Sequence, residues 1–588
     1  MRGRYFWIAI SILVLGGAFR LAVAHWLPND APGDGLIYAQ MARNVLEQHV
    51  YSHEAQPPYN PSLIRLPGYP LFLAGIYSIF GHTSNGAVRV VEALIDTATC
   101  GLIALLAFYW QPDEQKKRAS AIAALALAAI CPFTTIYAAT ILTEVPTNFL
   151  VVAMMLAATL ALRKQFTTEE TEEGKRKRTR QTLQWWIVAG VIGGLAVLFR
   201  PDNGLFVAAV GLTLVLGGSM RFWSAPAERS GDGSLECADL SALSKAAPSR
   251  RTPRGRFAHT VKQVLLYGAL FSIAFVIVLT PWTIRNWRVF HLFQPLAPAH
   301  AEMPGEFVPR GYGLWLRTWL DDDSYIAPLL WSLDTDPIDF EDFPPYAFDS
   351  PEEKSRVAAL IDRYNHPDGA PAAAESPQKA PGMPQPSPSA ANANPAPSPK
   401  KSPSNSNANA EEEDSEEGDE ESEKEQQDVE MTPEIDAGFA EIARARIARH
   451  RFQFYVLLPI KRARTMWFDT HSQYWPFEGT LLPFEDLDYD SHQQIWLPLF
   501  AGLTALYTLL GLAGAWFLWG SGKLEARQWV LLVGLAIVLR LILFSSLENP
   551  EPRYLVEFFP LLSILGGIAI GQFTPRMNAD MSQTSNPN

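Results

Sequence analysis

The sequence predicts an all-α protein that crosses a membrane many times. The chain has 588 residues, and 48% of them are of hydrophobic type, yet the mean hydropathy is only +0.01. This mean describes neither kind of segment in the chain, because long apolar runs alternate with very polar segments. A helix of about 20 apolar residues can cross the bilayer core, which is about 30 Å thick. Many runs approach that length, so we predict a polytopic membrane protein.

Charge placement orients the predicted spans, because lysine and arginine favour the cytoplasmic side. We predict about ten crossings on length and hydropathy. They lie near residues 5–27, 88–110, 119–138, 146–163, 184–200, 204–220, 263–282, 495–519, 528–546 and 554–574. The basic loops near 116–118, 163–180 and 250–256 then all face the cytoplasm. The N-terminal run is too long for a signal-peptide core and is read as a retained span.

The apolar stretch 69–81 is ambiguous, since it could be a short span or a helix lying on the outer surface of the membrane. Counting it as a crossing would invert the agreement between the basic loops and the cytoplasmic side. We therefore predict a surface helix, which places residues 28–87 outside. The resulting organisation is a membrane module over 1–282, an outer region over 283–494, terminal spans over 495–575 and a cytoplasmic tail over 576–588.

The outer region contains an insert of unusual composition. Residues 366–432 run through Pro, Ala, Ser and Asn into an acidic block, with few apolar side chains to offset chain entropy. We predict that this insert is disordered and dispensable for chemistry. Much of the net charge of −13 comes from the acidic block, so it indicates no basic partner, and no nucleic-acid partner is expected. Cys100, Cys131 and Cys237 imply no disulfide framework.

Four polar clusters fall on the outer face of this topology. They are Asp34 with Arg65, Glu144, Arg285 with Asn286, and Arg553 with Tyr554. Asp34 stands between two glycines where a loop turns into an amphipathic helix, and Arg65 precedes a rigid Pro-Gly-Tyr-Pro turn. A carboxylate and a cation at one membrane edge could handle a lipid-linked phosphate.

Each of these residues also has a structural interpretation. Asp34 could cap its helix, and Arg65 could extend toward lipid head groups. Glu144 could favour a helix dipole as a first-turn acid, and Arg553 could pair with Glu548 or Glu551. Arg20 and Arg540 lie within spans, where a charge is costly without a partner.

Motif order adds a resemblance. The sequence shows Gly-Asp-Gly-x-x-Tyr, Arg-x-Pro-Gly-Tyr-Pro-Leu-Phe, Thr-Glu-Val-Pro, Phe-Arg-Pro, Pro-Trp-Thr-Ile-Arg-Asn and Pro-Arg-Tyr, in that order. This series resembles bacterial membrane glycosyltransferases of the GT-C superfamily, family 39 type, which are related to protein mannosyltransferases and to the lipid A aminoarabinose transferase. The resemblance covers most of the chain except 366–432 and the cytoplasmic loops.

The resemblance implies a GT-C-like helical bundle, a polyprenyl-phosphate sugar donor and a catalytic acid in the first outer loop, which Asp34 matches. Glu144 matches a second outer-loop acid, where relatives often have Asp. Arg65 matches the cation that binds the lipid phosphate. The remaining donor-binding candidates from the same motifs are Arg285, Tyr38, Tyr69, Arg200, Arg553 and Tyr554.

The chemistry fits independently of the resemblance. Sugar transfer from a phosphate needs a base for the acceptor and cations for the departing phosphate. Asp34 can supply the base, and Arg65 with Arg285 can hold the phosphate. We predict an inner-membrane glycosyltransferase, a hexosyl or pentosyl transferase of inverting type by resemblance, with its site on the outer face and a lipid, glycan or protein acceptor. The alternatives are a transporter or flippase and a non-catalytic scaffold.

Cofactors are not required by this prediction. No Gly-rich phosphate loop follows a strand, so no nucleotide fold is expected. His291 and His300 lack ligand-like spacing. No metal site is predicted, although a divalent metal ion bound through Glu144 stays open as an alternative.

Overall fold

The computed structural model is helical throughout the part of the chain that it describes. That part comprises residues 2–27, 33–81, 83–164, 171–224, 253–300, 302–367, 429–469 and 491–574, and no β-strand occurs in it. Residues 368–428, nearly all of the insert predicted to be disordered, lie outside the described residues, as does the whole predicted tail 576–588. The predicted all-α class is confirmed.

Eight helices are long and apolar enough to cross a membrane, among the residues described. Six of them are α1 (Arg2–Trp26), α4 (Asn85–Trp110), α7 (Glu144–Lys164), α8 (Glu172–Phe199), α9 (Gly204–Ser224) and α10 (Pro253–Phe290). The other two are α15 (Ser491–Gly520) and α16 (Leu524–Ser545). The chain is a multi-pass membrane protein, and eight of the predicted spans correspond to these helices.

Two predicted spans are realised less regularly. The stretch 119–138 forms a bent pair, α5 (Lys117–Ala129) followed by Pro132–Ala139, with an angle of 53° between the halves. The last predicted span becomes α17 (Phe558–Gln572), a helix of only 15 residues that is buried along most of its length. At about 1.5 Å per residue, α17 is shorter than a bilayer core. The bent pair raises the count of candidate spans to nine.

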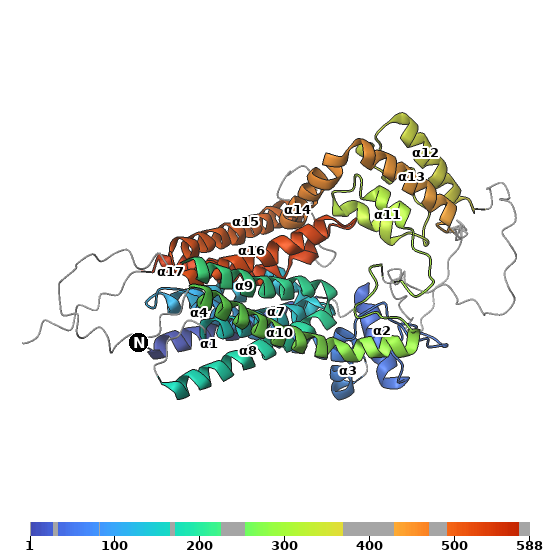
Figure 1. Cartoon of the computed structure of the whole chain (residues 1–588). Helices are drawn as coiled ribbons and strands as arrows, with labels where there is room; N and C mark the ends of the chain where they lie inside the picture. Colours follow the sequence, from blue (N-terminus) through green and yellow to red (C-terminus); the bar gives the residue numbers. More distant parts are fainter. Residues whose placement is uncertain are drawn as a thin grey trace, which may run out of the picture. The chain divides into compact units, whose positions relative to one another are not determined.

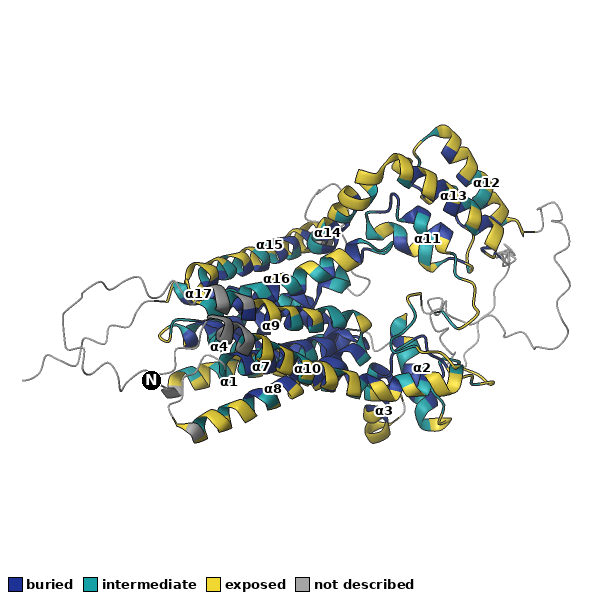
Figure 2. Cartoon of the chain, viewed as in Figure 1, coloured by how far each residue is buried: buried dark blue, intermediate teal, exposed yellow. Residues whose placement is uncertain are grey.

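The chain forms two compact units. The first comprises residues 1–306 and 459–588 and contains all the candidate spans, together with α2 (Asp34–Glu47), α3 (Gly68–Phe80) and most of α14 (Leu458–Phe468). Large apolar side chains remain exposed on its outer helices, for example Trp7 at 66% and Leu15 at 69%, as expected for side chains that face lipid (Figure 2).

The helices of the first unit run side by side, so its charged loops gather at two ends (Figure 1). At one end the Lys116 ammonium donates to the Gln572 side chain at 2.7 Å, and Lys523 donates to the Pro112 carbonyl at 2.6 Å. These residues come from loops that the charge pattern assigns to the cytoplasm. Helices α2 and α3 lie at the opposite end.

Helix α3 is the apolar stretch for which a surface position was predicted. It has 13 residues and is too short to cross a bilayer. Its first residue must be glycine, because a Cβ at Gly68 would lie only 2.6 Å from the Leu198 carbonyl oxygen of α8. Gly81, with φ of 109°, ends the helix in a conformation that favours glycine. The close approach ties the Pro-Gly-Tyr-Pro turn to the end of α8.

Arg20 has the partner that its position inside a span requires. Its Nε donates to Asp96 of α4 at 2.6 Å, and both side chains are almost wholly buried. Its Nη atoms donate to the carbonyls of Ala128 and Ala129 at 3.1 and 2.9 Å, where α5 ends at the bend. A helix end leaves carbonyls without intrahelical partners, so Arg20 satisfies them and stabilises the bend between α5 and its continuation.

The second unit comprises residues 307–458 and has a core of its own. It contains α11 (Arg310–Leu316), α12 (Pro351–Asn365) and α13 (Pro433–Arg449). Trp315 packs against Phe439 with ring centroids 5.2 Å apart, and both are buried. A buried Arg446–Glu353 pair at 2.9 Å links α13 to α12.

We predict that Arg20→Gln lowers the free energy of unfolding by about 3 kcal/mol, since it leaves the Asp96 carboxylate buried without its cation. Arg4→Gln, at an exposed position of the same helix, serves as the matched control. Thermal unfolding of the purified protein in detergent measures both. Equal melting temperatures for the two variants would show that the Arg20–Asp96 ion pair does not stabilise the fold.

Candidate active site at one end of the helical bundle

The outer-face residues predicted from the sequence lie at one end of the first unit. Asp34 begins α2, Glu144 begins α7, and Arg200 ends the α8 helix. Arg65 comes from the loop before α3, and Arg553 from the loop before α17. Antiparallel helices bring these distant segments together because their loops alternate between the two ends of the bundle.

Asp34 is shared between two guanidinium groups. Its Oδ1 accepts from Arg65 at 2.8 Å, and its Oδ2 lies 3.5 Å from Arg553. The Asp34 side chain is 28% exposed and the Arg65 side chain 23%, so solvent still reaches the pair. The Gly33 residue before α2 has φ of 56° and positions Asp34 at the first turn. Both carboxylate oxygens therefore face cations. Asp34 does not cap α2, because the N-cap is Gly33 and no side-chain capping hydrogen bond forms.

The electrostatics of Asp34 follow from this geometry. Burial alone would raise the pKa of its carboxyl, but Arg65 and then Arg553 outweigh that effect and hold the pKa below its ordinary value. The pKa of Tyr38, one helical turn further along α2, shifts in the opposite direction. Burial, followed by the charge of Asp34, raises the pKa of Tyr38 to about 12. Asp34 is thus ionised and Tyr38 is a neutral hydroxyl.

Glu144 is held by Arg200 rather than by Arg65. The Arg200 Nη1 donates to Glu144 Oε1 at 2.7 Å. The other oxygen, Oε2, is buried without a hydrogen-bond partner among the described residues. Arg200 also reaches Asp202 at 3.2 Å and Glu557 at 3.6 Å. This one arginine therefore connects the starts of α7, α9 and α17.

Arg540, the second arginine predicted inside a span, completes the network. It is fully buried, and its Nη1 lies 2.7 Å from Asp202 while its Nη2 lies 3.0 Å from Glu557. Nη2 also donates to the Tyr554 carbonyl at 2.8 Å. Asp202 and Glu557 thus each contact two arginines. Sequence reasoning missed both acids as site residues, although Asp202 directly follows the Phe-Arg-Pro motif.

Arg553 pairs with Glu551 as well as with Asp34, which selects one of the two partners considered for it. Tyr554 donates its hydroxyl to Glu551 Oε1 at 2.6 Å and accepts from Asn549 at 2.8 Å. The Arg553 guanidinium lies 5.6 Å from the Tyr554 ring centre. These contacts order the loop that carries Arg553 toward Asp34.

Arg285 belongs to a neighbouring cluster. Its Nη1 donates to the Ser62 carbonyl at 2.7 Å and to Asn286 at 3.0 Å. The guanidinium also lies over the rings of Tyr51 and Trp282, at 5.5 and 5.0 Å. Tyr51 in turn donates its hydroxyl to the Arg65 carbonyl at 3.2 Å. Arg285 therefore holds the loop that carries Arg65, and its own cation is adjacent to that loop.

Tyr69 is too deeply buried to contact a substrate. It is wholly buried, and its hydroxyl donates to Glu92 of α4 at 2.8 Å. Its ring meets the Tyr38 ring edge to face, with centroids 5.1 Å apart. The structure thus forms one set of ion pairs around Asp34, with Arg65 and Arg553, and a second set around Arg200, with Glu144. Tyr554 joins the two sets, since its ring lies 5.8 Å from the Arg200 guanidinium. Tyr38 lies beside Asp34, Tyr69 contacts Tyr38, and Arg285 holds the Arg65 loop.

The described residues around Asp34 and Glu144 do not form an evident metal site. Among the described residues, no three carboxylate, imidazole or thiol groups converge within ligand distance around Asp34 or Glu144. Both acids already contact guanidinium groups. Their charge is balanced by arginine, so we derive no step through a divalent ion.

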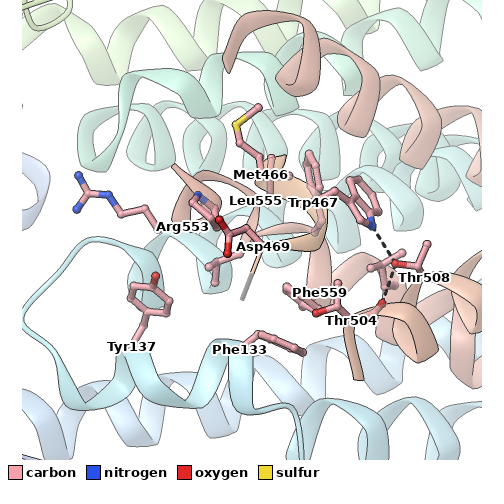
Figure 3. A pocket seen from close by; sticks show the side chains of 14 residues that line it. Phe133, Tyr137, Met466, Trp467, Asp469, Thr504, Thr508, Arg553, Leu555 and Phe559 are labelled. Atoms are coloured by element: carbon pink, nitrogen blue, oxygen red, sulfur yellow. Dashed lines mark hydrogen bonds between the residues drawn. The ribbon is translucent and has the colours of Figure 1, made fainter. Parts of the chain in front are cut away.

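An apolar crevice adjoins the charged network. Figure 3 shows Phe133, Phe559 and Trp467 on its walls, with Arg553 at one side. Phe133 and Phe559 stack with centroids 4.2 Å apart, and Trp467 donates to Thr508 at 2.9 Å. Charge and apolar surface therefore meet at Arg553, which suits an amphiphilic ligand.

Comparison with known proteins gives one family match. Residues 60–226 match the family described as dolichyl-phosphate-mannose-protein mannosyltransferase, which is fewer than a third of the chain. The match confirms, over that segment, the predicted resemblance to protein mannosyltransferases. It includes Arg65, Glu144 and Arg200. No protein of curated function matches the sequence.

Two solved structures show a distant similarity to this chain. The archaeal oligosaccharyltransferase AglB from Archaeoglobus fulgidus, in complex with an inhibitory peptide and a dolichol-phosphate, superposes with a TM-score of 0.40 at 12% identity; the match covers 95% of this chain and 50% of AglB. This chain thus spans about half the length of AglB. ArnT from Cupriavidus metallidurans bound to undecaprenyl phosphate gives 0.32 at 12% identity, covering 97% of this chain and 79% of ArnT.

We predict a pH-dependent contribution of Asp34 to stability. The folded-state pKa of its carboxyl is depressed, so the ion pairs stabilise the fold above the ordinary value of 3.8 and are lost as pH falls through the lower folded value. Asp34→Asn should therefore lower the melting temperature at neutral pH, and the difference from wild type should shrink below pH 3.8. A difference that stays constant as the pH falls would show that the charge of Asp34 does not stabilise the fold.

Proposed function

We propose that this chain is a membrane glycosyltransferase that moves a sugar from a polyprenyl-phosphate donor to an acceptor hydroxyl or amine on the extracytoplasmic face. The observation that carries the proposal is Asp34, an ionised and partly exposed carboxylate held between Arg65 and Arg553. The family match over residues 60–226 supports the reaction class, and its name supports a lipid phosphate donor.

The donor phosphate has a natural place beside Arg65. A guanidinium binds phosphate oxygens well and in a fixed geometry. In the ligand-free arrangement Arg65 is neutralised by Asp34, so the phosphate competes with the Asp34 carboxylate for the same cation. Because Arg65 and Arg553 are what depress the pKa of Asp34, a phosphate that draws Arg65 away raises the basicity of Asp34. Donor binding thereby prepares the base.

In the transfer step one bond to the anomeric carbon forms and one breaks. An acceptor oxygen or nitrogen attacks the anomeric carbon of the donor sugar, and its proton passes to the Asp34 carboxylate. The bond between the anomeric carbon and the phosphate oxygen breaks, and the electron pair leaves with the polyprenyl phosphate. Arg65 and Arg553 stabilise the negative charge that develops on that phosphate. Attack from the face opposite the phosphate gives inversion, for a hexosyl or pentosyl donor.

Glu144 supports this reaction as an orienting group. Arg200 fixes one of its oxygens, and the other is buried without a partner among the described residues. That free oxygen can accept a hydrogen bond from an acceptor or sugar hydroxyl if the substrate reaches it. The wider network through Arg540 makes Glu144 rigid, which is the property that an orienting group needs.

Asp34→Asn tests the base. The change keeps the size of the side chain and its ability to start a helix, and it should lower the transfer rate by about 10²–10⁴-fold. The assay follows labelled sugar from a polyprenyl-phosphate donor into membrane acceptors. Asp113→Asn, in a loop at the other end of the bundle, is the matched control. A wild-type rate in Asp34→Asn would remove Asp34 from the chemistry.

Arg65→Ala tests the phosphate contact. Loss of a charge-assisted contact should raise KM for the donor as well as lower kcat, because the guanidinium binds phosphate in both the ground state and the transition state. Arg43→Ala is the matched control, because Arg43 is also an arginine near Asp34 in the sequence but donates to Gln40 and not to Asp34. An unchanged donor KM in Arg65→Ala would place the phosphate elsewhere.

Impermeant thiol labelling in intact cells tests the proposed side of the membrane. In a background without native cysteines, Thr83→Cys lies between α3 and α4 at the site end, and Glu114→Cys lies at the opposite end. We expect labelling at 83 and protection at 114. The reverse pattern would put the site in the cytoplasm.

A further inference from the structure

The described part of the chain contains a buried acid that the proposed reaction does not use. Glu92 lies in the second turn of α4 and is wholly buried. Its Oε1 accepts the Tyr69 hydroxyl at 2.8 Å, while its Oε2 is buried without a hydrogen-bond partner among the described residues. Burying a carboxyl with one oxygen unmatched costs free energy, so its position needs an explanation beyond packing.

Glu92 connects to Asp34 through two tyrosines. Tyr69 meets Tyr38 edge to face, with ring centroids 5.1 Å apart and planes at 83°. Tyr38 stands four residues after Asp34 on α2, so the two lie on the same face of that helix, one turn apart. The hydrogen bond to Glu92 of α4 therefore fixes the Tyr69 ring of α3, and the Tyr38 ring of α2 packs against that ring.

If the hydrogen bond to Glu92 were lost, the Tyr69 ring could not find a new position by shifting toward α8. Gly68 brings the backbone of α3 against the Leu198 carbonyl, where even a Cβ would lie 2.6 Å from the oxygen. Tyr69 also contacts the Phe199 ring at 6.4 Å. Burial, followed by the neighbouring charge of Glu92, raises the pKa of Tyr69 well above its ordinary value, so the hydroxyl stays protonated and remains a donor.

We propose that Glu92 is a positioning residue: by accepting the Tyr69 hydroxyl it fixes Tyr38, and through Tyr38 the angle at which Asp34 meets Arg65. The inference rests on the proposed function for its effect on rate. Tyr69, a donor-binding candidate by motif, becomes the link between Glu92 and the site.

The chain offers a matched control for the Tyr69–Glu92 bond. Tyr77, two turns further along α3, is also buried and donates its hydroxyl to Asn85 of α4 at 3.0 Å. It joins the same two helices by the same kind of bond, two turns further from Gly68 along α3. Tyr77→Phe therefore reproduces the loss of a buried tyrosine hydrogen bond without touching the path to the site.

Three variants test the proposal in the full-length protein. Tyr69→Phe and Glu92→Leu should each lower kcat by about 10- to 100-fold, the range for a small displacement of a reacting group, with the donor KM close to wild type. The double variant should be no slower than the slower single one, because both remove the same bond. Glu92→Gln keeps an acceptor for the Tyr69 hydroxyl and should retain most of kcat. Tyr77→Phe should lower the melting temperature comparably and leave kcat unchanged.

Several results would overturn the positioning role. Among them are a wild-type kcat in Tyr69→Phe, equal losses of kcat in Tyr69→Phe and Tyr77→Phe, and a Glu92→Gln enzyme as slow as Glu92→Leu. A readout independent of activity separates this proposal from the proposed function. Amide hydrogen exchange over residues 38–44 of α2 should speed up in Tyr69→Phe and not in Tyr77→Phe. If wild type transfers no sugar but exchange follows this pattern, the proposed function fails and the structural link holds; unchanged exchange in Tyr69→Phe overturns the link itself.

Discussion

A single carboxylate shared by two guanidinium groups is the contact on which the site depends. Asp34 meets Arg65 and Arg553, which come from opposite ends of the sequence. Oppositely charged groups at this separation attract strongly only where water is partly excluded, and the helices around the site provide that exclusion. The pair therefore requires the start of α2, the turn before α3 and the segment before α17 to meet.

The deeper charge network makes that meeting rigid. Arg200 and Arg540 each contact Asp202 and Glu557, and Arg200 also holds Glu144. A buried ion pair contributes little net stability when compared with apolar packing, but breaking one is costly. The network thus acts mainly as a constraint, since every helix end that carries a site residue is tied to another. Its position at one end of the bundle, away from mid-membrane, also favours interfacial chemistry over the transport alternative.

The sequence predicted much of this fold because membrane physics leaves few choices. Apolar length and the basic loops were enough for the order of the spans, and the structure contains eight long helices at the expected places. The shortness of α17 and the bend after Ala129 were not predicted, since hydropathy does not report helix ends inside apolar sequence. Arg20 could be recognised as needing a partner, but Asp96 could not be chosen for it, because pairing across 76 residues depends on how helices pack.

The site was predictable in composition and less so in connectivity. Motif order pointed to Asp34, Arg65, Glu144 and Arg553, and these do lie at one end of the bundle. Which cation meets which acid was not predictable, and Arg285 proves to hold the Arg65 loop through Ser62. Glu92 escaped notice although a charged residue inside an apolar run is itself a signal.

The central claim is that donor phosphate and Asp34 compete for Arg65. A cryo-electron microscopy structure of the full-length protein with bound polyprenyl phosphate tests it most directly. We expect phosphate oxygens within hydrogen-bond distance of Arg65 and an Asp34 carboxylate released from that arginine. Phosphate bound away from Arg65, with the 2.8 Å contact between Arg65 and Asp34 intact, would contradict it.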